Sequence, residues 1–409
     1  MPVDRLNHLL KQRLDELDRS GTAKHHESVV SGVVPPTATD GPRYLLAGEP
    51  DQAFVRMNSN GYLGMALQPA VIAAEENAVR EFGAGPQAVR FISGTFAPHT
   101  RLEQRLAAFH DREAAMVVSS AYATVMAVLP SLVTPETIVI SDDLNHNCII
   151  NATRLAQPAR KLVIPHLDLA RLDEALAAEA GRARRALVVT DGVFSMRGDH
   201  APLDRIMTMA DHHDPGYAEN LVVMVDDSHG VGAFGATGRG TEEVTGARSD
   251  VLVGTLGKAF GVNGGYVVGS HHLIDYLRET AATYVYSNPI TPAEAAAAHA
   301  AVDLVDSAAG IALLQRLRAM TTRFRAGLVD LGYETIPGEH PVVPLVVRDT
   351  DRTRSLVAHL RKRGVLATGL AYPVVPRGED EVRFQISADH TVADIDAVLD
   401  VLAAFPSLS

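Results

Sequence analysis

The residues of this chain best suited to chemistry are a lysine and an aspartate, each at the end of an apolar run. Lys258 lies among small residues in Gly254–Gly261, and Asp226 ends the run Leu221–Asp226, shortly before His229. A lysine with space around it can bond covalently to a flat aldehyde cofactor, while a carboxylate can hold a protonated ring nitrogen. A histidine beside that carboxylate can reach the phenolic oxygen of the same ring. Together the three residues indicate a site for pyridoxal 5′-phosphate (PLP).

Each of these residues also has a more ordinary interpretation. Lys258 alone would be a surface lysine, and Asp226 and His229 alone would mark a capped turn. A metal site built from Asp226, Asp227 and His229 is disfavoured, because consecutive strand residues point to opposite faces. The single cysteine, Cys148, excludes an intramolecular disulfide and a cysteine metal cluster. The order of strand, aspartate, histidine, strand and lysine favours PLP, and no metal is expected.

Other candidate contacts follow the ends of neighbouring apolar runs. Ser120, Ala121 and Tyr122 lie where a strand gives way to a helix, so their backbone amides can bind a phosphate. The hydroxyl of Thr255 can add to that set. His146 can stack on the pyridine ring, although a histidine satisfied within a turn explains the local sequence equally well.

Another polar residue, Ser195, also follows an apolar run. It lacks the Gly-x-Ser-x-Gly pattern around it, so a serine hydrolase is disfavoured.

The elements that must position these residues alternate between strand and helix. The expected strands are 115–119, 137–141, 161–165, 186–190, 221–226, 251–255 and 266–269. Nearly continuous apolar strands separated by helices indicate an α/β protein with a mainly parallel sheet. Ligands of such sheets bind beyond the carboxyl ends of the strands, where Asp191, Asp226 and Lys258 lie.

Three sections are expected along the chain. They are an N-terminal helix and linker at 1–50, a large PLP-binding domain at 51–291, and a small C-terminal α+β domain at 292–409. Residues from about 21 to 42 form the expected linker. Leucines from Leu6 to Leu17 share one helical face, which predicts packing against the rest of the protein or a second subunit. Capping patterns predict helix starts at Thr100, Thr291 and Thr391.

Composition limits the partners and the compartment. The chain has 409 residues, 46% of them hydrophobic and 21% charged, and a net charge of −12 without a basic block. These values fit a soluble globular protein and argue against nucleic acid as a partner. No apolar run approaches the length that spans a bilayer, so no membrane association and a cytoplasmic location are expected.

In its ordered motifs the chain resembles the α-oxoamine synthases, and among them the glycine C-acetyltransferase (2-amino-3-ketobutyrate CoA ligase) branch. The motifs that carry the resemblance lie at 60–64, 89–95, 145–146, 191–196, 225–230, 254–259, 284–288 and 372–376. The resemblance implies an aspartate-aminotransferase-like fold and a homodimer. It also implies condensation of an amino acid with an acyl-CoA, after which CoA leaves.

The resemblance also implies a role for each matching residue. Lys258 would hold PLP covalently and then move the Cα proton, with Asp226 on the ring nitrogen, His229 and Ser195 on the phenolic oxygen, and His146 stacked on the ring. The phosphate would be held by Ser120, Ala121, Tyr122 and Thr255, with Ser287 and Asn288 from a second subunit. Asn60 and Arg383 would bind the amino-acid carboxylate. Val89 and Phe91 stand where succinyl-using relatives have Thr and Asn, which predicts a short or apolar acyl donor such as acetyl-CoA.

Several residues depart from the usual pattern of the family near the stacking histidine. They are Val125, Asn147, Cys148, Asn151 and Ala152. Neutral drift and a changed substrate pocket both explain them. Two further alternatives are another aminotransferase or lyase of the same fold, and a non-catalytic regulatory subunit. The second is disfavoured because the chain keeps Lys258.

Overall fold

A seven-stranded sheet forms the centre of the larger part of the computed structural model, which describes residues 1–20, 23, 27–372 and 374–406. Its strands, in the order in which they lie, are β4 (Ala114–Val118), β10 (Gly265–Gly269), β9 (Val251–Thr255), β8 (Asn220–Asp226), β7 (Arg185–Asp191), β5 (Thr137–Asp142) and β6 (Arg160–Ile164). The pairs from β9 to β6 are parallel, whereas β10 is antiparallel to both of its neighbours. The prediction of a mainly parallel sheet is confirmed. The short connection from β9 to β10 forces the one reversal, because a parallel pair needs a long crossover.

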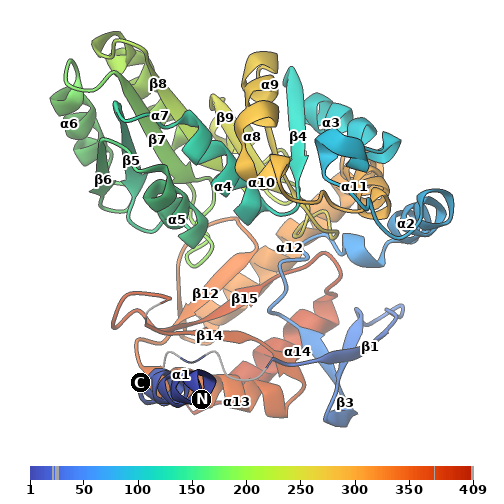
Figure 1. Cartoon of the computed structure of the whole chain (residues 1–409). Helices are drawn as coiled ribbons and strands as arrows, with labels where there is room; N and C mark the ends of the chain where they lie inside the picture. The colour runs from blue at the N-terminus through green and yellow to red at the C-terminus, as the bar shows by residue number, and fades with distance from the viewer. Residues whose placement is uncertain (21–22, 24–26, 373, 407–409) are drawn as a thin grey trace.

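Helices cover both faces of this sheet (Figure 1). They include α2 (Pro69–Phe82), α3 (Ala97–Phe109), α4 (Ala121–Leu132), α5 (Asn147–Ala156), α6 (Leu169–Glu179), α7 (Leu203–His213), α9 (His271–Thr280) and α11 (Pro292–Val305). Alternate strand residues separate into two buried clusters. Met116 and Val118 of β4 pack in the cluster that contains residues of α4, α5 and α9, while Val117 packs in the cluster that contains residues of α3, α6 and α7. Burial on both faces explains why these strands read as continuous apolar runs.

The smaller part of the fold contains two four-stranded sheets. One has the order β11 (Glu334–Thr335), β12 (Val342–Val346), β15 (Glu381–Gln385) and β14 (Thr368–Leu370), and the other β1 (Val30–Val34), β2 (Arg43–Leu46), β3 (Glu49–Arg56) and β13 (Val365–Leu366). Helices α12 (Ala308–Asp330), α13 (Thr350–Lys362) and α14 (Val392–Ala403) belong to the same part.

The N-terminal strands correct two sequence predictions. The segment expected as a linker contains β1, and the boundary expected at residue 50 falls inside β3. Since β3 pairs in parallel with β13, the N-terminal strands join the C-terminal part of the chain. Residues 21–22 and 24–26 of the predicted linker, and Pro373 of the motif at 372–376, lie outside the described residues.

Two of the three predicted helix starts are confirmed. Thr291 and Glu294 form a reciprocal capping box at α11, with distances of 3.0 and 2.6 Å, and Thr391 caps α14. The third prediction was wrong, because α3 begins at Ala97 and the Thr100 hydroxyl donates to the Ala97 carbonyl. A proline in the first turn of α3 places the helix start before Thr100.

Helix α1 (Pro2–Arg19) has no buried residue. The exposed fractions of Leu9 and Leu14 are 56% and 61%, so the described part of the chain leaves these two leucines largely uncovered. Among the described residues, no single helix is long and apolar enough to span a membrane. Of the described helices, only α11 and α12 counted together meet that length and composition, across a bend of 76°.

Candidate active site

The carboxyl ends of β7, β8 and β9 bring the predicted acidic residues and the lysine together. Asp191 and Asp226 are paired in the register of β7 and β8, and both side chains are buried. Burial lowers the pKa of Lys258 to about 8, although the carboxylates of Asp226 and Asp191 act to raise it. The folded chain therefore supplies an amine that is partly neutral near pH 8, as a base or nucleophile requires.

Asp226 and Asp227 face different partners. One oxygen of Asp226 accepts hydrogen bonds from the hydroxyl (2.6 Å) and the amide (3.2 Å) of Ser228, and the other accepts from the Cys148 thiol (3.4 Å). The carboxylate of Asp227 accepts from the amide and the hydroxyl of Thr241, each at 2.7 Å. The geometry therefore does not support the alternative of a metal ion shared by the two carboxylates.

Asp191 is a buried acidic residue. The sequence predicts its place at a strand end but assigns it no function. Its Oδ2 accepts the amide of His146 at 3.0 Å, while its Oδ1 is buried with no partner among the described residues. Burial and the nearby charge of Asp226 raise the pKa of Asp191 well above its ordinary value. The raised pKa means that the neutral, protonated form of Asp191 is favoured more than in an ordinary aspartate.

His146 caps α5 through its own side chain. Its Nδ1 accepts the amide of Cys148 at 3.2 Å and lies 2.9 Å from the Cys148 sulfur. Since Nδ1 accepts a backbone hydrogen bond, the ring proton of neutral His146 is on Nε2. Burial lowers the pKa of His146. Cys148, one of the departures from the family pattern, thus contacts both His146 and Asp226.

Polar side chains from β15 meet the loop after β3. Arg383 and Gln385 lie two positions apart on β15 and so share a face; Arg383 Nη1 donates to the carbonyl of Ser195 at 2.9 Å, and the amide of Gln385 donates to Asn60. The Nε of Arg383 and the Oε1 of Gln385 are buried with no partner in the described part of the chain. The predicted carboxylate residues Asn60 and Arg383 therefore converge, and an incoming carboxylate can satisfy the free guanidinium nitrogen.

The sequence missed two residues of this group, Gln385 and Tyr62. The hydroxyl of Tyr62 lies 2.7 Å from Nδ1 of His229. The alternation of Arg383 and Gln385 on one strand was a usable signal for Gln385, whereas nothing local indicates the contact of Tyr62.

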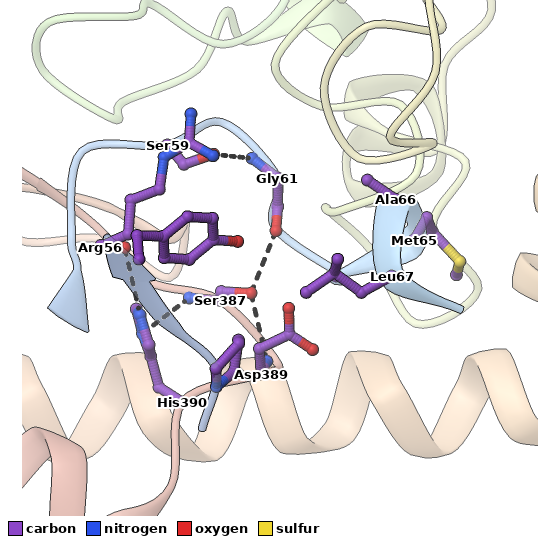
Figure 2. A pocket seen from close by; sticks show the side chains of 12 residues that line it. Arg56, Ser59, Gly61, Met65, Ala66, Leu67, Ser387, Asp389 and His390 are labelled. Atoms are coloured by element: carbon purple, nitrogen blue, oxygen red, sulfur yellow. Dashed lines mark hydrogen bonds between the residues drawn. The ribbon is translucent and has the colours of Figure 1, made fainter. Parts of the chain in front are cut away.

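A small cavity of about 70 Å³ lies beside the loop that carries Asn60 (Figure 2). The hydroxyl of Ser387 donates to the carbonyl of Gly61 at 3.0 Å, which ties this loop to the end of β15. Gly64 has a φ of +65°, and a Cβ there would collide with the carboxylate of Asp389. The close approach fixes the loop that presents Asn60 and Tyr62.

The start of α4 provides a donor set for a phosphate. The hydroxyl of Ser120 caps the helix by accepting the amide of Ala123 at 3.1 Å, and the amides of Ala121 and Tyr122 lie in the first turn, where no intrahelical acceptor exists. A Cβ at Gly265 of β10 would collide with the amide of Ala121. Thr255, three residues before Lys258, is buried. Its hydroxyl donates to the carbonyl of Gly264 and accepts from the amide of Gly257. Amides, hydroxyls, the lysine and the buried carboxylate fit the groups of PLP.

The remaining predicted site residues lie at the surface of the single chain. Ser287 and Asn288 are exposed, as is Phe91, with an exposed fraction of 67%. Val89 immediately precedes, and Phe91 lies within, the π-helical turn η2 (Arg90–Gly94). Neither residue therefore lies in a strand.

An ion-paired histidine holds the segment around Ser195. His166 lies 3.0 Å from Asp142 and 3.1 Å from Asp199, and its ring packs edge-on against Phe194. Burial disfavours the charged form of His166, but the two carboxylates outweigh it and raise its pKa to about 9.

We expect His166 to make stability depend on pH. A histidine whose pKa is raised on folding stabilises fully below its unfolded pKa of about 6.5, and this contribution is lost as the pH rises through about 9. The loss should be about 2–4 kcal/mol in the free energy of unfolding. Denaturant titrations at several pH values should show that His166→Asn removes this pH-dependent decrease in the free energy of unfolding. His299→Asn, which breaks a surface pair with Asp303, should keep it.

Comparison with known proteins agrees with this geometry. The model of the aminotransferase class I and II family matches residues 52–402. The mitochondrial 2-amino-3-ketobutyrate coenzyme A ligase of Bos taurus is 38% identical over 97% of this chain and 91% of its own length. The 8-amino-7-oxononanoate synthase of Thermosipho melanesiensis is 40% identical over 84% and 85%, respectively. A serine palmitoyltransferase of Sphingomonas wittichii superposes with a TM-score of 0.87 at 27% identity, covering 98% of this chain and 96% of that one. The S. paucimobilis serine palmitoyltransferase with a bound PLP–myriocin adduct superposes with a TM-score of 0.86 at 26% identity, covering 98% of this chain and 97% of that one.

The fold and the site define a PLP-dependent enzyme of the aminotransferase type, and the chain belongs to the aminotransferase class I and II family. Within that family it is an α-oxoamine synthase, an acyltransferase that condenses an amino acid with an acyl-CoA and uses PLP as its cofactor.

Proposed function

We propose that this enzyme joins glycine, or a closely related α-amino acid, to a short apolar acyl group such as the acetyl group of acetyl-CoA. The products are CoA and a β-keto amino acid, or the α-aminoketone formed when carbon dioxide is also lost. The choice of a short apolar acyl donor rests on the hydrogen bonds of Arg90, the charged residue between Val89 and Phe91. Its Nη2 donates to Glu103 at 3.1 Å and its Nε to Thr95 at 3.0 Å, while its buried Nη1 has no partner among the described residues. The side chains on either side of it, Val89 and Phe91, are apolar.

The residues of the chain divide the work of this reaction. When bound, PLP supplies an electron sink for the carbanion formed at Cα of the amino acid. Arg383 and Asn60 orient the carboxylate of the amino acid, and Asp226 holds the ring nitrogen in its protonated form. The amine of Lys258 takes the Cα proton, which its lowered pKa allows. The carbon–carbon bond would then form between Cα and the thioester carbon, as the bond from that carbon to sulfur breaks and CoA leaves as its thiolate.

Acetyl-CoA should be turned over faster than succinyl-CoA. The side chains of Val89 and Phe91 offer no hydrogen-bond donor to the far carboxylate of a succinyl group, so succinyl-CoA gains no polar contact there. The assay is an amino-acid by acyl-CoA matrix, with acetyl-, butyryl- and succinyl-CoA and mass detection of products. A preference for succinyl-CoA would overturn the proposed donor. Product formation without any CoA thioester would instead favour the alternative of an aminotransferase or lyase.

We also propose that the enzyme is a homodimer with composite active sites. Three apolar side chains next to the site are uncovered in the single chain: Phe91, Ile92 and Tyr286, the last with an exposed fraction of 80%. Ser287 and Asn288 follow Tyr286 and would reach the phosphate of the partner subunit's cofactor. Leu9 and Leu14 of α1 are also exposed among the described residues, and we expect a second subunit to cover them.

Sedimentation should give twice the 43.7 kDa mass of one chain. A sharper test mixes two inactive variants, Lys258→Ala and Ser287→Glu, after dissociation. If each site takes residues from both chains, one site of the hybrid dimer carries neither change, and activity partly returns. A fully active monomer, or mixed subunits that stay inactive although hybrids form, would contradict the composite site.

A further inference from the structure

We infer that Tyr62 is a positioning residue that fixes the tautomer of His229, so that the Nε2–H group of His229 can donate to the phenolic oxygen of the cofactor. The inference deepens the proposed function, because it rests on the contact proposed between His229 and that oxygen. It assigns a role to a residue that lies in the motif at 60–64 but to which the resemblance gave none.

The contact joins two buried side chains from distant parts of the chain. Tyr62 follows β3, His229 follows β8, and the Tyr62 hydroxyl lies 2.7 Å from Nδ1 of His229. Tyr62 is fully buried and His229 is buried. Burial raises the pKa of Tyr62 above its ordinary value and lowers the pKa of His229 well below its own, so both groups are neutral.

The direction of this hydrogen bond follows from the available partners. Among the described residues the phenol has two acceptors in reach, Nδ1 of His229 at 2.7 Å and Oδ1 of Asn60 at 3.3 Å. The contact to Nδ1 is much the shorter of the two, so we assign the phenol proton to it. The single proton of neutral His229 is then on Nε2.

The backbone of His229 is held by a second imidazole. Nδ1 of His340 accepts the amide of Val342 at 3.1 Å, so its Nε2–H donates to the carbonyl of His229 at 2.9 Å. The rings of Tyr62 and His340 also pack edge to face, with centroids 5.5 Å apart. Both residues lie outside the seven-stranded sheet, so segments other than the strand that precedes His229 set its position and its protonated nitrogen.

The charged and titratable groups around His229 keep it neutral. After burial, the groups that lower its pKa are Lys258, His340, Arg383 and His146. Each of these side chains carries a positive charge when protonated, and each comes from an element packed around the site. A positive charge on His229 itself is therefore disfavoured. The Nε2–H group is then the donor that remains for the phenolic oxygen.

The test compares holoenzyme carrying Tyr62→Phe with a matched control, Tyr217→Phe. Tyr217 is also buried, but its hydroxyl donates to the Leu176 carbonyl at 2.8 Å. In Tyr62→Phe the Nε2–H tautomer of His229 is no longer fixed. The phenolic oxygen of the cofactor then loses its hydrogen-bond donor and becomes more basic. The pH midpoint of the bound cofactor's absorbance change should rise by about 0.5–1 unit. The control should match the wild type, and an unshifted midpoint in Tyr62→Phe would overturn the inference.

A second measurement does not depend on the folding of a variant. The ¹⁵N chemical shifts of histidine-labelled wild-type holoenzyme, assigned with His229→Gln, should show an unprotonated Nδ1 and a protonated Nε2 at position 229. A protonated Nδ1 would overturn the inference. Neither measurement uses turnover, so the failure of the condensation assay and the failure of this inference are separate results.

Discussion

Replacing Lys258 with alanine should abolish covalent attachment of PLP and lower turnover by at least about 10³-fold. The side chain supplies both the amine that bonds to the cofactor and the base that moves the Cα proton. Borohydride treatment followed by peptide mapping should place the reduced label on Lys258 in the wild-type enzyme. Lys161→Ala, which removes an exposed lysine on β6, should keep both the label and the activity. A label on any lysine other than Lys258 would disprove the assignment.

The attachment should also depend on pH in a way that an ordinary lysine would not show. Only the neutral amine bonds to the cofactor, and burial lowers the pKa of Lys258 to about 8. After PLP is mixed with apoprotein, the rate of attachment should rise as the pH increases through about 8 and level off above it. An exposed lysine would still be gaining rate near pH 10, because its pKa is about 10.4. Stopped-flow absorbance across this range separates the two cases.

Arg383→Ala should weaken amino-acid binding while PLP stays bound. The guanidinium has a buried nitrogen without a partner among the described residues, and loss of a charge-assisted contact to a carboxylate costs about 2–4 kcal/mol. The apparent dissociation constant for the amino acid should therefore rise by about 30- to 1000-fold. Titration of the cofactor's absorbance with amino acid measures the affinity directly.

Two further variants define the cause of this loss. Arg383→Lys keeps the charge without the planar fork and should fall between the wild type and the alanine variant. Arg323→Ala breaks an exposed pair with Asp396 and should leave amino-acid affinity unchanged. If Arg383→Ala binds the amino acid as tightly as the wild type, Arg383 is not the carboxylate anchor.

Local sequence determined the central sheet of this protein and the order of its reactive residues. Strands buried on both faces must be apolar along their whole length, so their positions can be read from the chain, and polar residues at their ends mark the ligand edge. Asp226 and Lys258 lie at such ends, and both were found this way. The strand β1 was missed because it is mostly exposed, and its valines are interrupted by Ser31 and Gly32 within a segment rich in Ser, Gly and Pro.

Only the tertiary structure decided which distant side chains meet and how the lysine titrates. Asp191 stands beside Asp226 because β7 and β8 are neighbours, an order that neither strand encodes locally. Tyr62 reaches His229 across 167 positions of the chain. The lowered pKa of Lys258 arises from burial by elements packed around it, outweighing the carboxylates that favour its charged form. Contacts and desolvation of this kind depend on the three-dimensional neighbourhood, so the sequence could indicate the residues of the site but not their mutual positions or protonation.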